Sequence, residues 1–95
     1  MPRKLLRKRT YLHSLRDILS YIAQDKKSAA IHFEQTLNAK LSLLPENPEI
    51  YRTSLYRDDP AYRDMTFMGY TVVYRVTDEA IEVLDIFKWR VPENV

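Results

Sequence analysis

Arginine and aromatic side chains are interspersed through the second half of the chain, and together they could contact a macromolecular target. Arginine suits phosphate and carboxylate contacts, and an aromatic ring offers a stacking surface. The residues concerned are Arg52, Arg57, Arg63, Arg75 and Arg90, with Tyr51, Tyr56, Tyr62 and Trp89 among them. The same arginines could instead form surface ion pairs with neighbouring aspartates, and the tyrosines could be ordinary sheet residues.

The segment Lys88-Trp89-Arg90 is the most informative part of this set. It places a large aromatic side chain between two cations, directly after the last expected strand, so we expect it to be partly exposed. We therefore interpret one group of residues as candidates for binding a target. These residues are Arg63, Arg75, Lys88, Trp89 and Arg90.

Residues suited to common catalytic and metal sites are few. The chain has no cysteine and two histidines, His13 and His32, which fall on different expected helices. Neither histidine stands in a recognisable motif with a nucleophile and an acid. Asp58-Asp59-Pro60 contains a carboxylate pair, but adjacent aspartates before a proline are more typical of a turn than of a metal site. We therefore expect no catalytic residue, no metal and no cofactor.

The candidate residues must be positioned by a single hydrophobic core. A chain of 95 residues with 45% hydrophobic side chains supplies one domain, residues 1–95. The net charge of +2 is too small to indicate nucleic-acid binding by itself, but basic residues are concentrated within residues 3–9, as an electropositive edge or a solvated tail. No apolar run is long enough for a membrane span or a signal peptide, so we expect a cytoplasmic protein.

Two amphipathic helices are expected in the first half. Apolar residues recur at three- and four-residue steps after Thr10, a favourable N-cap, and predict a helix over residues 10–24. A second stripe, which stops at Pro45, predicts a helix over residues 28–44. The two helices form a hairpin whose apolar seam needs a broader surface to cover it.

The second half predicts that surface, because β-branched and aromatic residues become frequent and the helical spacing disappears. Strands are expected at residues 51–57, 61–67, 70–77 and 80–88, with Leu5-Leu6 as a possible further strand. Alternation directs Tyr70, Val72, Tyr74 and Val76 toward the helices. The last strand is apolar on both sides, which favours a central position, and Asp85 within it needs a polar partner. The fold class is therefore α+β.

Gly69 decides how two strands pair. Met68 would be strained at positive φ, so we expect a three-residue loop, Phe67-Met68-Gly69, with only Gly69 in the left-handed conformation. This loop places Met65 opposite Thr71, and Arg63 on the same face as Arg75. A two-residue loop would place the two arginines on opposite faces.

The order of elements and several short strings resemble the RelE/ParE family of bacterial type II toxin–antitoxin toxins. The resemblance extends over nearly the whole chain. Each string is weak alone, but together they are fairly specific. The strings are Leu15-Arg16-Asp17-Ile18, Tyr21-Ile22-Ala23, Leu44-Pro45 with Pro48, Tyr62-Arg63-Asp64, Gly69-Tyr70-Thr71-Val72-Val73-Tyr74-Arg75-Val76, and Ile81-Glu82-Val83-Leu84 with Ile86.

The resemblance implies a helical hairpin packed on a twisted, mainly antiparallel sheet of four to five strands. It also implies a cognate antitoxin, and growth arrest or plasmid stabilisation. Because helices and sheet cover only one face of each other, we expect this antitoxin to bind the helical hairpin face and an exposed strand edge. RelE-like members cut messenger RNA on the ribosome, whereas ParE-like members poison DNA gyrase. Fold alone does not separate these branches.

Departures from the ribonuclease pattern favour the ParE-like branch. Arg63 matches one cationic position of that pattern and Arg90 roughly another. Met65 and Thr71 stand where it has Lys and Arg, and neither Tyr nor His follows Tyr74. The sequence therefore predicts a non-enzymatic toxin that binds gyrase. The alternatives are a ribosome-dependent endoribonuclease acting on mRNA and an inactive toxin that retains only antitoxin binding.

Overall fold

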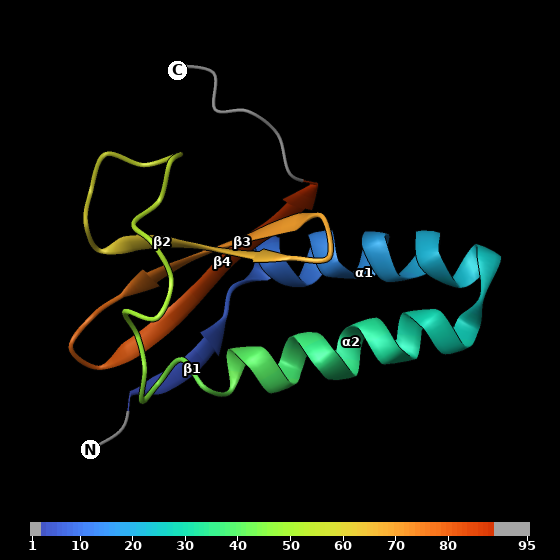
Figure 1. Cartoon of the computed structure of the whole chain (residues 1–95), viewed down its shortest axis with the longest axis horizontal. Coiled ribbons are helices and arrows are strands. Elements are labelled where there is room, and N and C mark those ends of the chain that lie inside the picture. The colour runs from blue at the N-terminus through green and yellow to red at the C-terminus, as the bar shows by residue number, and fades with distance from the viewer. Residues whose placement is uncertain (1–2, 89–95) are drawn as a thin grey trace.

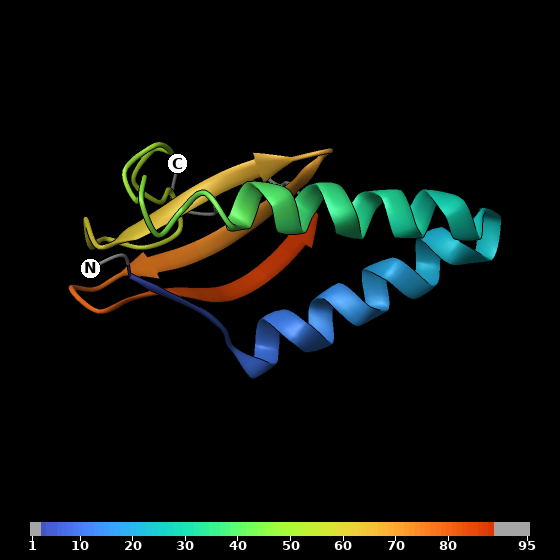
Figure 2. The ribbon, with the colours of Figure 1, turned by 90° about the horizontal axis from the view of Figure 1, so that it is seen from below.

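Two helices pack against one face of a four-stranded sheet in this computed structural model, which describes residues 3–88 (Figures 1 and 2). The helices are α1 (Arg9–Asp25) and α2 (Lys27–Leu41). The strands are β1 (Lys4–Arg7), β2 (Tyr62–Phe67), β3 (Tyr70–Val76) and β4 (Ala80–Lys88), in the order β1-β4-β3-β2. β1 runs parallel to β4, and the other two pairs are antiparallel. The predicted α+β fold and the central position of β4 are confirmed.

The two helices form the expected hairpin, with shifted ends. α1 begins at Arg9 with Lys8 as its N-cap, so the prediction that Thr10 caps the helix was wrong. Lys26 alone separates α1 from α2, and its extended backbone turns the chain sharply. α2 ends at Leu41 rather than at residue 44, and a tighter turn then brings Leu44 into the core. Both views show the far end of the hairpin projecting past the sheet (Figures 1 and 2).

Residues 51–57 do not form the predicted strand. Only Thr53 makes a bridge, to Arg63. The segment is instead tied to β2 by several different contacts: the Leu55 amide donates to Asp64 Oδ2 at 2.9 Å, and the Ser54 amide donates to the Tyr62 carbonyl at 2.8 Å. The aromatic and β-branched residues of this segment therefore belong to a loop that covers the edge of β2.

The β2–β3 turn also differs from the prediction. Phe67 pairs with Tyr70, so the loop contains only Met68 (φ 48°) and Gly69 (φ 84°). Both positive φ angles match a two-residue primed turn, whose twist suits the flanking strands. The shorter loop keeps Phe67 in β2, where its side chain packs in the core, and this packing outweighs the strain at Met68.

The hydrophobic core lies between the helices and the sheet. Phe33 of α2 makes edge-to-face ring contacts with two residues of the β2–β3 hairpin. Its ring centroid lies 5.1 Å from that of Phe67 and 5.5 Å from that of Tyr70. Tyr11 of α1 and Tyr74 of β3 are both fully buried in the same cluster. Their hydroxyl groups differ, because Tyr74 donates to the Pro48 carbonyl at 3.0 Å whereas the Tyr11 hydroxyl has no hydrogen-bond partner.

This difference predicts opposite effects of one substitution. Tyr74→Phe should lower the free energy of unfolding by about 1 kcal/mol, because it removes a hydrogen bond and leaves the Pro48 carbonyl without that donor. Tyr11→Phe should leave the free energy unchanged or raise it, because it removes a buried hydroxyl that has no partner. Urea unfolding at neutral pH measures both. Equal losses in the two variants would contradict this interpretation of Tyr11.

Candidate functional site

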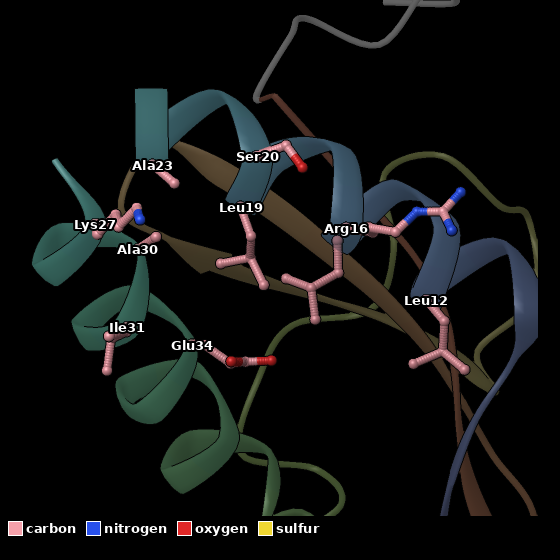
Figure 3. A pocket seen from close by; sticks show the side chains of 10 residues that line it. Leu12, Arg16, Leu19, Ser20, Ala23, Lys27, Ala30, Ile31 and Glu34 are labelled. Carbon is pink, nitrogen blue, oxygen red and sulfur yellow. The ribbon is translucent and has the colours of Figure 1, made fainter. Parts of the chain in front are cut away.

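An apolar groove of about 570 Å³ lies between the two helices (Figure 3). We call it the interhelical groove. Its apolar lining comprises Leu12, Leu15, Leu19 and Ala23 from α1 and Ala30 and Ile31 from α2. Leu12 is 47% exposed and Ile31 is 57% exposed, so part of this lining faces water. An apolar groove between helices suits the apolar face of an amphipathic helix.

The groove is apolar because the apolar stripe of α1 extends beyond the residues that are buried in the core. Leu15 is buried in the core, whereas Leu12 is exposed on the groove side of the same helix. Arg16, Lys27 and Glu34 add charged groups to the lining. Figure 3 shows Glu34 extending from α2 toward α1. The groove is therefore apolar inside and charged along its borders.

The described members of the sequence-predicted target set do not all lie on one face of the sheet. Arg63 pairs with Tyr74, and Tyr62 pairs with Arg75, so the two arginines project from opposite faces of the sheet. The expectation that they share a face was wrong, because the β2–β3 loop is one residue shorter than predicted. Met65 pairs with Val72 rather than with Thr71.

Both arginines also have partners within the chain. Arg63 Nη1 donates to the Tyr51 carbonyl at 2.7 Å and so holds the loop before β2. Arg75 Nη1 lies 2.9 Å from Glu82 Oε1 and forms an ion pair across β3 and β4. Lys88 is exposed at the end of β4. Trp89 and Arg90 lie outside the described residues.

Several other sequence features have clear positions. Asp59 accepts a bond from the Ala61 amide at 2.9 Å, which confirms that Asp58-Asp59-Pro60 belongs to a turn. Asp85 accepts a 2.6 Å bond from Ser14 Oγ of α1, so the predicted need for a polar partner is met. The basic residues near the start form strand β1 and the first turn of α1, and so make an edge rather than a tail.

No catalytic constellation emerges from this geometry. Within residues 3–88, no group of three or more histidines, aspartates and glutamates is placed to hold a metal ion. His13 and His32 are exposed on different helices. Burial raises the pKa of Tyr11 and of Tyr74 to about 12, so neither phenol is ionised near neutral pH.

Residues 5–90 match the family model described as "ParE toxin of type II toxin-antitoxin system, parDE". The chain belongs to the ParE toxin family. This match extends over almost all of the sequence and confirms the resemblance to RelE/ParE toxins. No curated protein sequence matches the chain significantly. No helix within residues 3–88 is both long and apolar enough to cross a membrane.

Solved structures of such toxins share the fold of this ParE-family chain. A structure of the chromosomal ParDE system from P. aeruginosa has 18% identity and a TM-score of 0.75, covering 93% of this chain and 97% of that chain. A mutant of E. coli toxin RelE in complex with an antitoxin RelBc peptide has 22% identity and a TM-score of 0.70, covering 96% and 87%. The E. coli DinJ-YafQ toxin–antitoxin complex has 17% identity and a TM-score of 0.64, covering 93% of each.

Sequence reasoning missed two features of this ParE-family protein. Ile31 lies beside the Ala30-Phe33-Leu37 stripe, and an apolar residue off the stripe was the available signal for an exposed groove. The second feature is Asp64, whose side chain is buried and accepts a hydrogen bond from the Leu55 amide. Its role as the anchor of the 51–57 loop could not be read from its position in an alternating strand.

Proposed function

We propose that this chain is the toxin of a type II toxin–antitoxin module, held inactive by an antitoxin whose amphipathic helix occupies the interhelical groove. The observation that carries the proposal is the partly exposed apolar lining of this groove in a member of the ParE toxin family. Burial of Leu12 and Ile31 under a partner would remove apolar surface from water. Structural neighbours that are complexes with antitoxins support a partner of this class.

A strand edge offers the antitoxin a second contact. β1 and β2 are the outer strands of the sheet. The edge of β2 is partly covered by residues 52–54, through the bonds of Ser54 and Asp64. Among the described residues, β1 has no strand neighbour on its outer side, and its Lys4 and Arg7 side chains are exposed. We therefore propose that an acidic antitoxin segment adds along β1.

For the cellular target, we propose DNA gyrase rather than ribosome-bound mRNA. RNA cleavage by the 2′-hydroxyl needs a base, an acid and cationic stabilisation of phosphate, each worth roughly 10²- to 10⁴-fold in rate. Arg63 and Arg75 are poor bases, because the pKa of an arginine side chain is about 12 or more and the guanidinium therefore keeps its proton near neutral pH. They also project from opposite faces of the sheet and are bound to Tyr51 and Glu82. Both features disfavour their action on one phosphate.

Target contact is proposed for the end of β4. Lys88 is exposed there, and the sequence continues with Trp89 and Arg90, an aromatic residue beside a second cation. Arg75 has a side chain that is 43% exposed, so it could add a peripheral contact despite its ion pair with Glu82. For Arg63 we propose a supporting role, because its guanidinium is bound to the Tyr51 carbonyl.

The test compares the two activities with the same purified protein. Toxin released from its antitoxin should inhibit gyrase supercoiling, while a ribosome-programmed mRNA should remain uncut at the same concentration. The matched variant is Lys88→Gln, which removes one exposed cation and should weaken gyrase inhibition without changing the melting temperature.

Codon-dependent cleavage that is lost in a folded Arg63→Ala variant would overturn the gyrase proposal and restore the ribonuclease alternative. Growth that continues normally when the chain is produced alone would instead indicate the other alternative, an inactive toxin that retains only antitoxin binding. Neutralisation by the antitoxin is measured separately, so the target and the partner are tested independently.

A further inference from the structure

A second hollow, of about 470 Å³, lies where β1 leads into α1, and we call it the arginine hollow. It is lined by Arg7, Arg9, Leu12, His13 and Arg16. Three of these five residues carry a permanent positive charge, and none of the five is a carboxylate. A cationic hollow of this composition attracts anions.

Among residues 3–88, no ion pair neutralises the cations of the arginine hollow. The ion pairs among residues 3–88 are Arg52–Asp64 and Arg75–Glu82, neither of which is in the hollow. Arg7 Nη2 makes only a long 3.4 Å bond to the neutral Asn38 Oδ1. In the described part of the chain, Arg9 and Arg16 make no side-chain hydrogen bond or ion pair.

The start of α1 adds to this positive potential. Lys8, the N-cap residue, makes no side-chain capping bond, and the first turn contains no acidic residue. The partial positive charge of the helix N-terminus is therefore not offset by a local carboxylate. A partner with carboxylates at this position would face both the helix terminus and the three arginines.

The arginine hollow adjoins the interhelical groove. Leu12 and Arg16 line both. A chain that lies in the groove and reaches the start of α1 must therefore pass directly onto Arg16 and then onto Arg7 and Arg9. The two hollows form one surface, apolar along the helices and cationic at one end.

We propose that the arginine hollow binds a cluster of Asp and Glu residues that flanks the groove-binding helix of the antitoxin. This proposal rests on the proposed function and specifies the chemistry of its partner. The antitoxin helix should carry an apolar stripe for the groove, with its acidic cluster at the end nearest Arg7 and Arg9. A basic residue should lie opposite Glu34, the one carboxylate of the groove lining.

A peptide fits this surface better than a nucleic acid. A nucleic acid would leave the adjoining apolar lining of the groove uncovered, whereas an amphipathic peptide covers it. The described residues that line the hollow include no phenylalanine, tyrosine or tryptophan on which a base could stack. An occupant with apolar and acidic side chains in one chain matches both parts.

The test uses two defined probes, a ten-residue glutamate peptide and a ten-nucleotide uridine RNA, titrated into the ¹⁵N-labelled full chain at low salt. We expect the peptide to shift the amide signals of residues 7–16 and to bind more tightly than the RNA. Arg9→Gln/Arg16→Gln should weaken peptide binding at least about fivefold, because two exposed charge contacts are lost. The control, Lys26→Gln/Arg57→Gln, removes two cations outside both hollows and should change affinity by less than about twofold.

Equal weakening in the two double variants, absence of peptide binding, or tighter binding of the RNA at the same residues would each overturn the proposal. The neutralisation assay keeps the underlying function separate. If the antitoxin still neutralises the toxin while the Arg9→Gln/Arg16→Gln variant binds peptide and antitoxin like the native chain, only the acidic-cluster inference fails. If the antitoxin does not bind the native chain, the proposed function itself fails.

Discussion

An Ile31→Asp variant is expected to escape its antitoxin, with about 100-fold weaker binding, and to arrest growth even when the antitoxin is co-produced. Ile31 lines the interhelical groove and is 57% exposed, so an aspartate there stays hydrated in the free toxin. In the complex the same carboxylate would be buried against an apolar partner surface and would lose its hydration. Substitutions of this kind at the centre of an interface have the largest effects on affinity.

The matched control is Ile50→Asp. Ile50 is also 57% exposed, but it lies in the loop after α2 and does not line the groove. We expect this variant to bind the antitoxin with native affinity. Isothermal titration calorimetry and co-production growth assays measure both outcomes, and a melting curve confirms that each variant is folded. Normal neutralisation of Ile31→Asp would place the antitoxin elsewhere.

The fold is expected to lose much of its stability between about pH 10 and pH 12. Burial raises the pKa of Tyr11 and Tyr74 to about 12, from the ordinary value of 10.0 that applies in the unfolded chain. A raised pKa means that the folded state favours the protonated phenol. The stabilisation is therefore complete below pH 10, falls as pH rises, and is lost above the folded pKa. Two units correspond to about 3 kcal/mol for each tyrosine.

Urea unfolding at several pH values between 8 and 12 measures this loss. Two such groups would account for about 6 kcal/mol, a large part of the stability of a typical domain. Tyr11→Phe and Tyr74→Phe should each make the curve of stability against pH flatter over this interval, because each removes one of the titrating groups. A curve that keeps its native slope in both variants would assign the alkaline transition to other residues.

The general architecture could be predicted because patterns within short stretches of sequence indicate most of its helices and strands. Apolar residues at three- and four-residue steps located both helices, and the two-sided apolar pattern of β4 correctly indicated a central strand. The Leu5-Leu6 strand was also confirmed, as part of β1. Many of the residues that define these patterns also lie in the core, among them Leu15 of α1, Phe33 of α2 and Ile86 of β4.

The errors arose where distant parts of the chain decide the local structure. The β2–β3 loop was predicted from the strain at Met68, but the need to keep Phe67 packed against Phe33 of α2 decided the shorter loop. The strand expected at residues 51–57 failed because Asp64, buried in β2, binds the backbone of that segment as a loop. Neither contact has a signal within a local window of sequence.

The candidate site was harder to predict for a related reason. Arginine identity alone does not show whether the guanidinium is available to a target or occupied within the chain. Arg63 and Arg75 both have internal partners. Arg9 was interpreted only as part of the basic stretch at residues 3–9 and Arg16 only as part of a family string, yet neither has a partner among the described residues. Availability depends on neighbours brought together by folding.

The parallel pairing of β1 with β4 has a consequence for the newly made toxin. Lys4 pairs with Ala80 and Arg7 with Val83, so the first strand to leave the ribosome must wait for the last strand of the sheet. The contacts between α1 and α2 join segments that are neighbours in sequence, so the hairpin can begin to form before the sheet is complete. The groove between α1 and α2 would then be present on the nascent chain before the end of β4 is synthesised. An antitoxin already in the cell could therefore engage the toxin during translation, before the toxin is able to reach its target.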